Sequence, residues 1–198
     1  MAKNTQPVLK RCRTLGVSPA AMGYSKNSNR NPGGKRRTKK SEYAMQLTEK
    51  QKVKFVYGIL EKQFRMLYEK AERMGGNTGE NLLSLVERRL DNTVYRLGFA
   101  KTRREARQLV NHGHFTVNGK RVNIPSYQVG LGDVIAVSEK SCSTTRFKTM
   151  KEDDAFIAAP KWLDRDKNAL SGKVIALPAK DDIDFEIAEN LIVELYSK

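Results

Sequence analysis

The sequence predicts an α+β protein: a helical domain, rejoined by the C-terminal helix, plus a compact helix-helix-hairpin module with a small antiparallel sheet. Two observations carry this prediction. Apolar residues recur at helical spacing through residues 43–74 and again through residues 80–97. Two hairpin signals then follow within residues 115–137, and helices segregated from strands in this way are typical of the α+β class. A basic, extended N-terminus precedes both parts.

Residues 1–41 are the most basic segment, with eleven Lys and Arg residues and no Asp or Glu in a chain of net charge +15. Residues 27–40 contain too few apolar side chains to fold alone. The alternative is a solvated tail, but the charge favours an extension that becomes ordered along nucleic acid. The candidate contacts in this segment are Lys3, Lys10, Arg11, Arg13, Arg30, Lys35, Arg36, Arg37, Lys39 and Lys40.

Composition excludes several classes of protein. A pI near 9.9 requires a polyanionic partner or a highly charged surface. The sequence contains no run of eighteen apolar residues, so no membrane span is predicted. It also has no apolar segment near the N-terminus, so no secretory signal is predicted. Cys12 and Cys142 are too few for a disulfide framework or a metal site, so we expect no metal, no cofactor and a cytoplasmic location.

The helical part begins with residues 43–74, which we expect to form one long helix. Gly58 interrupts it at a cost of about 1 kcal/mol. Residues 74–79 are then a turn, and residues 80–97 form a second helix that Gly98 ends. Three lysines on or beside the polar face of the long helix are candidate RNA contacts, and they are Lys50, Lys52 and Lys54.

A third helix begins at Thr102, whose side chain can cap it, while Glu105 can reach back to complete a capping box. Gly113 is placed to end it. A helix N-terminus already carries positive dipole charge, so cations there are unfavourable unless an anion binds. We therefore interpret the arginines as a phosphate-binding cluster, with a solvated basic face as the alternative. The cluster comprises Arg103, Arg104 and Arg107.

Two hairpins are expected after this helix. Asn118-Gly119 between residues 115–117 and 120–122 is a strong hairpin signal. Residues 127–129 and 134–137 are expected to form a second hairpin. Further candidate RNA contacts in the module are Lys101, Thr102, Gln108, His112, His114, Lys120 and Arg121. The two histidines have no evident partner or pocket for general-base chemistry.

The C-terminal part is less regular. Trp162 is expected to anchor packing, and residues 172–178 are expected to form a strand that ends at Pro178. Residues 189–196 are expected to be helical and to pack on the long helix, because eight residues are too few for a stable isolated helix. The predicted domains are an RNA-ordered extension (1–41), a helical domain (42–88, completed by 178–198) and an RNA-binding module with its attached sheet (89–177).

Several motifs together resemble bacterial small-subunit ribosomal protein four. They are Leu90-Asp-Asn-Thr-Val-Tyr-Arg-Leu-Gly98, Thr102-Arg-x-x-Ala-Arg-Gln-Leu-Val-x-His112, Val117-Asn-Gly and Ile124-Pro-Ser-Tyr127. The resemblance extends to Asn77-Thr-Gly-Glu-Asn-Leu-Leu83 and to the terminal Leu191-Ile-Val-Glu-Leu-Tyr-Ser-Lys198. It covers roughly residues 42–137 and the C-terminus, and it is looser over residues 138–177.

This resemblance implies a non-enzymatic protein that binds the 5′ domain of small-subunit rRNA early in assembly. It implies contacts with ribosomal proteins five and three, a position near the mRNA entrance and a contribution to translational accuracy. Many family members bind zinc through N-terminal cysteines, whereas this chain keeps only Cys12 there and resembles the zinc-free branch. Thr48 stands where many members have arginine, which weakens the implied mRNA-unwinding role.

Two other functions remain as alternatives. The same module is attached to RNA-modifying enzymes, but too little chain remains here for a large catalytic domain. A free RNA chaperone would need only the module, so residues 43–74 and the C-terminal helix would be superfluous. No small-molecule substrate and no membrane partner is expected.

Overall fold

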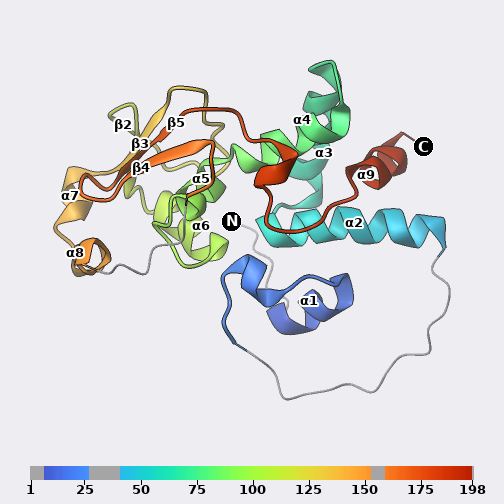
Figure 1. Cartoon of the computed structure of the whole chain (residues 1–198), viewed down its shortest axis with the longest axis horizontal. Helices are drawn as coiled ribbons and strands as arrows, with labels where there is room; N and C mark the ends of the chain where they lie inside the picture. Colours follow the sequence, from blue (N-terminus) through green and yellow to red (C-terminus); the bar gives the residue numbers. More distant parts are fainter. Residues whose placement is uncertain (1–6, 27–40, 153–158, 198) are drawn as a thin grey trace. The chain divides into compact units, whose positions relative to one another are not determined.

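The structure is a computed structural model that describes residues 7–26, 41–152 and 159–197 (Figure 1). The chain divides into two compact units. The first unit comprises Met1–Leu82 and Ile183–Lys198, and the second comprises Leu83–Asp182. No helix in the described ranges is both long and apolar enough to cross a bilayer. The α+β class expected from the sequence is confirmed.

Helix α1 and a 3-10 turn occupy a part of the N-terminus that was expected to be extended. Helix α1 spans Val8–Leu15, and the turn η1 spans Pro19–Met22. Four apolar side chains from this stretch are buried, and they are Cys12, Leu15, Val17 and Met22. The expectation of an extended backbone is therefore wrong for residues 8–22, because these few apolar residues share one side of a short helix and turn. The run of residues 27–40 lies outside the described residues.

The long helix expected over residues 43–74 is two helices. Helix α2 spans Glu42–Tyr57 and helix α3 spans Glu61–Arg73. Gly58 separates them because it adopts a left-handed conformation with φ of 65° and its N–H bonds back to carbonyls of α2. A glycine accepts this conformation without the Cβ penalty of other residues, so it ends the helix instead of interrupting it.

The C-terminal helix α9 (Glu189–Tyr196) packs on α2, as expected. Gln46 of α2 donates a hydrogen bond of 3.1 Å to the Glu194 carboxylate. The ring of Tyr196 stacks on Tyr68 of α3 with centroids 4.7 Å apart. A short helix that would be unstable alone is therefore held by side chains of two other helices.

Helix α4 (Thr78–Glu87) contains the boundary between the two units, and helix α5 (Leu90–Arg96) begins the module. One helix was expected over residues 80–97, but Arg89 is extended. The backbone there pairs with a later segment, because Arg88 O accepts from Val129 N and Leu90 N donates to Tyr127 O. Long-range backbone pairing thus breaks a pattern that is continuously helical in sequence.

The module also contains α6 (Arg103–Asn111) and a five-stranded antiparallel sheet. The strands are β1 (Phe115–Val117), β2 (Lys120–Arg121), β3 (Val134–Val137), β4 (Leu163–Asp166) and β5 (Ser171–Val174). They lie in the order β2-β1-β3-β5-β4. The strand expected over residues 172–178 is β5, but the expected end at Pro178 is wrong because the strand ends at Val174.

The first expected hairpin is confirmed and the second is wrong. Asn118 and Gly119 both have positive φ, and Val117 pairs with Lys120 across the turn. Residues 127–129 form only an isolated bridge, in which Gln128 pairs with Arg89. Strand β3 instead pairs with β1 and β5. Residues 127–129 bond instead to the backbone between α4 and α5, so they are not part of the sheet.

Helices α7 (Glu139–Cys142) and α8 (Thr145–Glu152) follow β3, and the turn η2 spans Lys180–Asp182. The core of the module gathers apolar side chains from α5, α6, the sheet and α8. Its largest members include Phe99, Phe115, Phe147 and Trp162, all almost fully buried. The expectation that Trp162 anchors packing is therefore confirmed.

Candidate nucleic-acid interface

The start of α6 is capped as the sequence predicts. The Thr102 hydroxyl accepts a hydrogen bond of 3.2 Å from Glu105 N. The Glu105 carboxylate reaches back to accept from Lys101 N at 2.7 Å. The cap therefore fixes the direction of the first turn of α6, on which the basic cluster lies.

The three arginines of that cluster differ in their surroundings. Arg103 is only 7% exposed; its Nε donates to Asn92 Oδ1 at 2.8 Å, and its guanidinium lies 4.3 Å from the Tyr95 ring centroid. Arg107 is half-buried, with Nε 3.9 Å from Asp91 Oδ2. Arg104 is exposed, and its side chain makes no hydrogen bond, ion pair or ring contact with another described residue. Arg104 is therefore the best placed of the three for an external phosphate.

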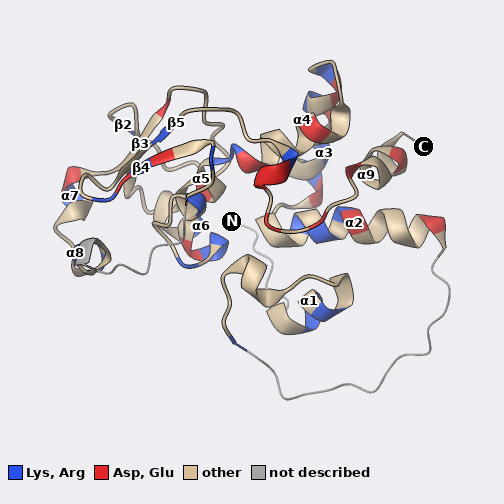
Figure 2. Ribbon diagram, viewed as in Figure 1, with Lys and Arg blue, Asp and Glu red and all other residues tan. Residues whose placement is uncertain are grey.

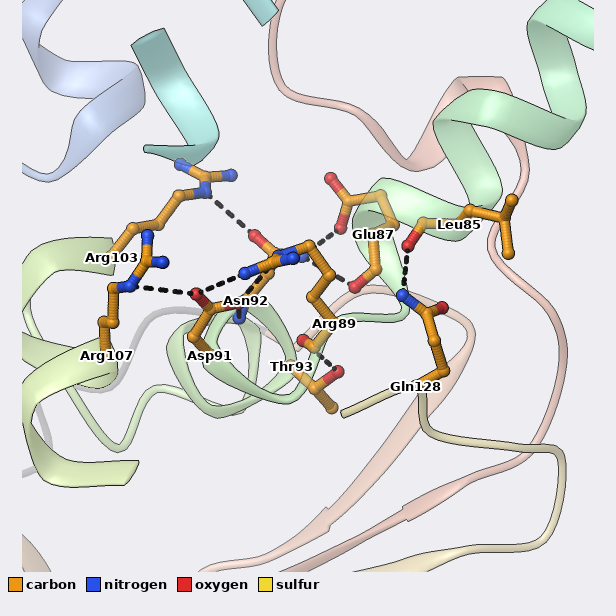
Figure 3. Close-up of polar contacts among 9 residues, drawn as sticks. All are labelled: Leu85, Glu87, Arg89, Asp91, Asn92, Thr93, Arg103, Arg107 and Gln128. Carbon is orange, nitrogen blue, oxygen red and sulfur yellow. Dashed lines mark hydrogen bonds and ion pairs between the residues drawn. The ribbon is translucent and has the colours of Figure 1, made fainter. Parts of the chain in front are cut away.

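Asn92 links Arg103 to the end of α4 (Figure 3). Its amide nitrogen donates to the Glu87 carboxylate at 2.6 Å and to the Glu87 backbone carbonyl at 2.9 Å. Its amide oxygen accepts from Arg103. One buried asparagine thus joins α4, α5 and α6, and it sets the orientation of the α6 N-terminus through hydrogen bonds.

Two buried ion pairs surround Asn92. Arg96 donates to both oxygens of Glu87, at 3.0 and 2.7 Å. Arg89 donates to both oxygens of Asp91, at 3.2 Å each. Removing one partner of such a pair leaves a buried charge and costs about 3–5 kcal/mol. Arg89 and Arg96 therefore stabilise the fold of the module, and the sequence pattern does not reveal this role.

The basic hairpin residues also divide. Arg121 donates to Gly113 O at 2.9 Å and to His112 O at 3.0 Å, so its side chain caps the carbonyl end of α6. Gly113 has a φ of +73°, and a Cβ there would meet the Arg121 guanidinium at 2.4 Å. The expected helix end at Gly113 is confirmed. Lys120 is exposed at the turn.

The half-buried His114 side chain contacts other residues of the module. Its Nδ1 lies 2.9 Å from Ser141 Oγ, and its ring packs against Phe147 with centroids 5.9 Å apart. Burial lowers the pKa of His114, and nearby His112, Arg146 and Arg121 lower it further. His114 is thus mainly neutral near pH 7, when it contributes a hydrogen-bonding group and little charge.

The three lysines of α2 are paired within the first unit. Lys50 lies 2.9 Å from Glu61, Lys54 binds the other oxygen of Glu61, and Lys52 lies 2.7 Å from Glu49. Their side chains are only 12–14% exposed. Burial alone would raise the pKa of Glu61, but hydrogen bonds from Lys54, Lys50 and Tyr196 lower it to about 2.

Other predicted contacts are exposed or lie outside the described residues. Lys101, Gln108, His112 and Lys120 are exposed on the module, and Lys10 and Arg13 are exposed on α1, where Arg11 is half-buried. Figure 2 shows basic residues on α1 and at the start of α6. The predicted contacts that the structure does not describe are Lys3, Arg30, Lys35, Arg36, Arg37, Lys39 and Lys40.

Cys12 packs with Met22, its Sγ 3.8 Å from the Met22 Sδ. Within the described ranges, no group of three or more His, Cys, Asp or Glu side chains is arranged to hold a metal ion. Cys12 therefore packs as a buried residue between α1 and η1.

Two residues near the site were not among the predicted contacts. Arg146 of α8 donates to Glu105 Oε1 at 2.6 Å. The basic stretch that contains Arg146 was visible in sequence, but its contact with α6 was not. Asn92 gave no signal, because its two partners Glu87 and Arg103 lie five and eleven residues away and meet it only once α4, α5 and α6 are packed together.

A basic surface around a capped helix of a compact α+β module defines a protein of the nucleic-acid-binding class. Comparison with known families identifies the parts. Residues 3–87 match the ribosomal protein S4/S9 N-terminal domain, and residues 88–135 match the S4 domain.

Two of the similar proteins align over their whole length. The small ribosomal subunit protein uS4 of Fusobacterium nucleatum is 54% identical, and that of Lachnospira eligens is 55% identical, each over the whole of both chains. The uS4 protein of Caldicellulosiruptor saccharolyticus is 65% identical over 83% of this chain and 79% of its own length. The chain belongs to the small ribosomal subunit protein uS4 family, which is a family of structural proteins and not of enzymes.

Proposed function

We propose that this chain is a structural constituent of the small ribosomal subunit that binds rRNA directly, through the α6 surface and the basic residues 1–41. The observation that carries the proposal is the exposed Arg104 on the capped first turn of α6, inside the matched S4 domain. Phosphate contacts of this kind fix the register of a protein on folded RNA.

The two contact regions have different roles in this proposal. Residues 1–41 carry eleven cations and supply most of the salt-dependent affinity. The α6 surface supplies orientation, because Asn92 and the buried pairs hold it rigidly. The proposed domains are the extension 1–41, the helical domain 42–88 with 178–198, and the RNA-binding module 89–177, which contains α6.

Early assembly, the rRNA 5′ domain, translational accuracy and contacts with ribosomal proteins five and three belong to the same proposal. Family membership supports them. An mRNA contact through α2 has weaker support, because Lys50 and Lys54 already bind Glu61 and the Thr48 hydroxyl bonds to Ala44 O. A free RNA chaperone is disfavoured by identity with relatives over both units.

The direct test is filter binding of the full chain to a transcript of the rRNA 5′ domain, with a transcript of permuted sequence as control. We expect preference for the 5′ domain and co-sedimentation with small subunits through a high-salt wash. A variant with Lys35, Arg36, Arg37, Lys39 and Lys40 replaced by serine should lose up to about four from the slope of log affinity against log salt. Equal binding of both transcripts would contradict a ribosomal role.

A further inference from the structure

Helix α8 lies outside the stretch that matches the S4 domain, yet it contacts α6 directly. Arg146 of α8 donates to Glu105 of α6 across 41 residues of sequence, at 2.6 Å. The next residue, Phe147, is buried and packs edge-on against Phe115 with centroids 6.2 Å apart. Phe147 therefore anchors α8 in the core of the module and leaves Arg146 facing the first turn of α6.

The carboxylate that receives Arg146 is the one that completes the cap of α6. One oxygen of Glu105 accepts from Lys101 N, and the other accepts from Arg146. Burial alone would raise the pKa of Glu105, but the bonds from Arg146 and from the Lys101 backbone lower it. Glu105 is thus ionised at neutral pH, and it fixes Arg146 relative to the helix start.

Arg146 keeps room for a second partner. Its side chain is 38% exposed, and within the described residues only its Nη2 makes a hydrogen bond. A guanidinium carries five N–H groups in a planar fork, so Nε and Nη1 can still donate to a phosphate. Arg146 balances the charge of Glu105, and the exposed Lys101 and Arg104 keep the start of α6 basic.

We propose that Arg146 is a further RNA-binding residue, which binds an RNA phosphate beside the first turn of α6 and extends the RNA-binding surface beyond the S4 domain. This proposal rests on the proposed rRNA-binding function. The packing of Phe147 explains how α8 is anchored, and RNA binding explains why Arg146 lies beside α6. It also explains why a half-buried carboxylate is tolerated on a helix start that binds an anion, because Glu105 holds a second cation there.

The test compares Arg146→Gln, Arg146→Lys and Lys148→Gln in the full chain. Lys148 is the matched control, because it is an exposed cation on the same helix. Filter binding to the 5′-domain transcript is measured at several salt concentrations. Arg146→Gln should weaken binding about three- to tenfold and lower the salt slope by about one, as expected for one lost phosphate contact. Arg146→Lys should keep the slope, and Lys148→Gln should match the wild-type protein.

Weaker binding by Arg146→Gln with an unchanged salt slope would show that Arg146 only supports the fold, and it would overturn the proposal. An equal loss in Lys148→Gln would also overturn it, because the effect would then be general charge. Arg104→Gln separates this proposal from the proposed function. If Arg104→Gln weakens binding and Arg146→Gln does not, only the inference about Arg146 fails; if the wild-type chain shows no preference for the transcript, the proposed function fails.

Discussion

Helices α2 and α6 each carry three basic residues, but the surroundings of these residues differ. The three lysines of α2 are bound to Glu49 and Glu61 and are almost covered. On α6, Arg103 is buried in a hydrogen-bond network, whereas Arg104 is exposed and its side chain makes no hydrogen bond, ion pair or ring contact with another described residue. Net charge therefore identifies the class of partner, but tertiary pairing decides which cations are available to that partner.

The two units also differ in how their ion pairs are placed. In the module the Glu87–Arg96 pair is nearly inaccessible, whereas in the first unit the Glu61 side chain is 49% exposed. Buried pairs are costly to break from one side, and exposed pairs contribute little. Two measurements of stability test this difference between buried and exposed ion pairs.

The largest effect is expected for Glu87→Ala. It leaves Arg96 buried without this carboxylate and removes an acceptor of Asn92, so the free energy of unfolding should fall by about 3–5 kcal/mol. Denaturant unfolding measures this loss. Glu69→Ala is the control, because Glu69 pairs with Arg65 on the surface at 3.3 Å and should lose less than about 0.5 kcal/mol. Similar losses in both variants would remove the contrast between buried and exposed pairs.

A smaller effect is expected for Glu61 and depends on pH. Its pKa is lowered from the ordinary 4.5 to about 2 in the folded protein, so its contribution to stability is present above pH 4.5 and is lost as pH falls toward 2. Solvent screening limits the contribution to about 1 kcal/mol. Wild type should be more stable than Glu61→Gln at pH 6, and the difference should shrink at pH 2.5. A difference that does not change with pH would contradict this role of Glu61.

Local signals in the sequence predict much of the module. Thr102 and Gly113 set the ends of α6, and Asn118-Gly119 sets the β1–β2 turn, because each needs only its near neighbours. The docking of α9 was predictable because a helix of eight residues needs a partner. The basic composition also predicts a polyanionic partner.

What the sequence could not predict depends on long-range contacts. The break at Arg89 arises because residues 127–129 pair with the backbone there, which also removes the second expected hairpin. The pairing of Lys50 and Lys54 with Glu61 requires the turn at Gly58. Arg103 was expected to face an external anion with Arg104, but its contact with Asn92 exists only once α5 and α6 are packed. Whether Arg103 also contacts RNA stays a prediction.

The proposed RNA contact is the exposed cation of α6 and not a paired lysine of α2. It is tested most directly by comparing Arg104→Gln with Lys54→Gln in filter binding to the 5′-domain transcript across a salt series. Arg104→Gln should weaken binding about three- to tenfold and lower the salt slope by about one, with unchanged unfolding. Lys54→Gln should bind like the wild-type chain. A loss of affinity and slope in Lys54→Gln, with Arg104→Gln unaffected, would contradict the account.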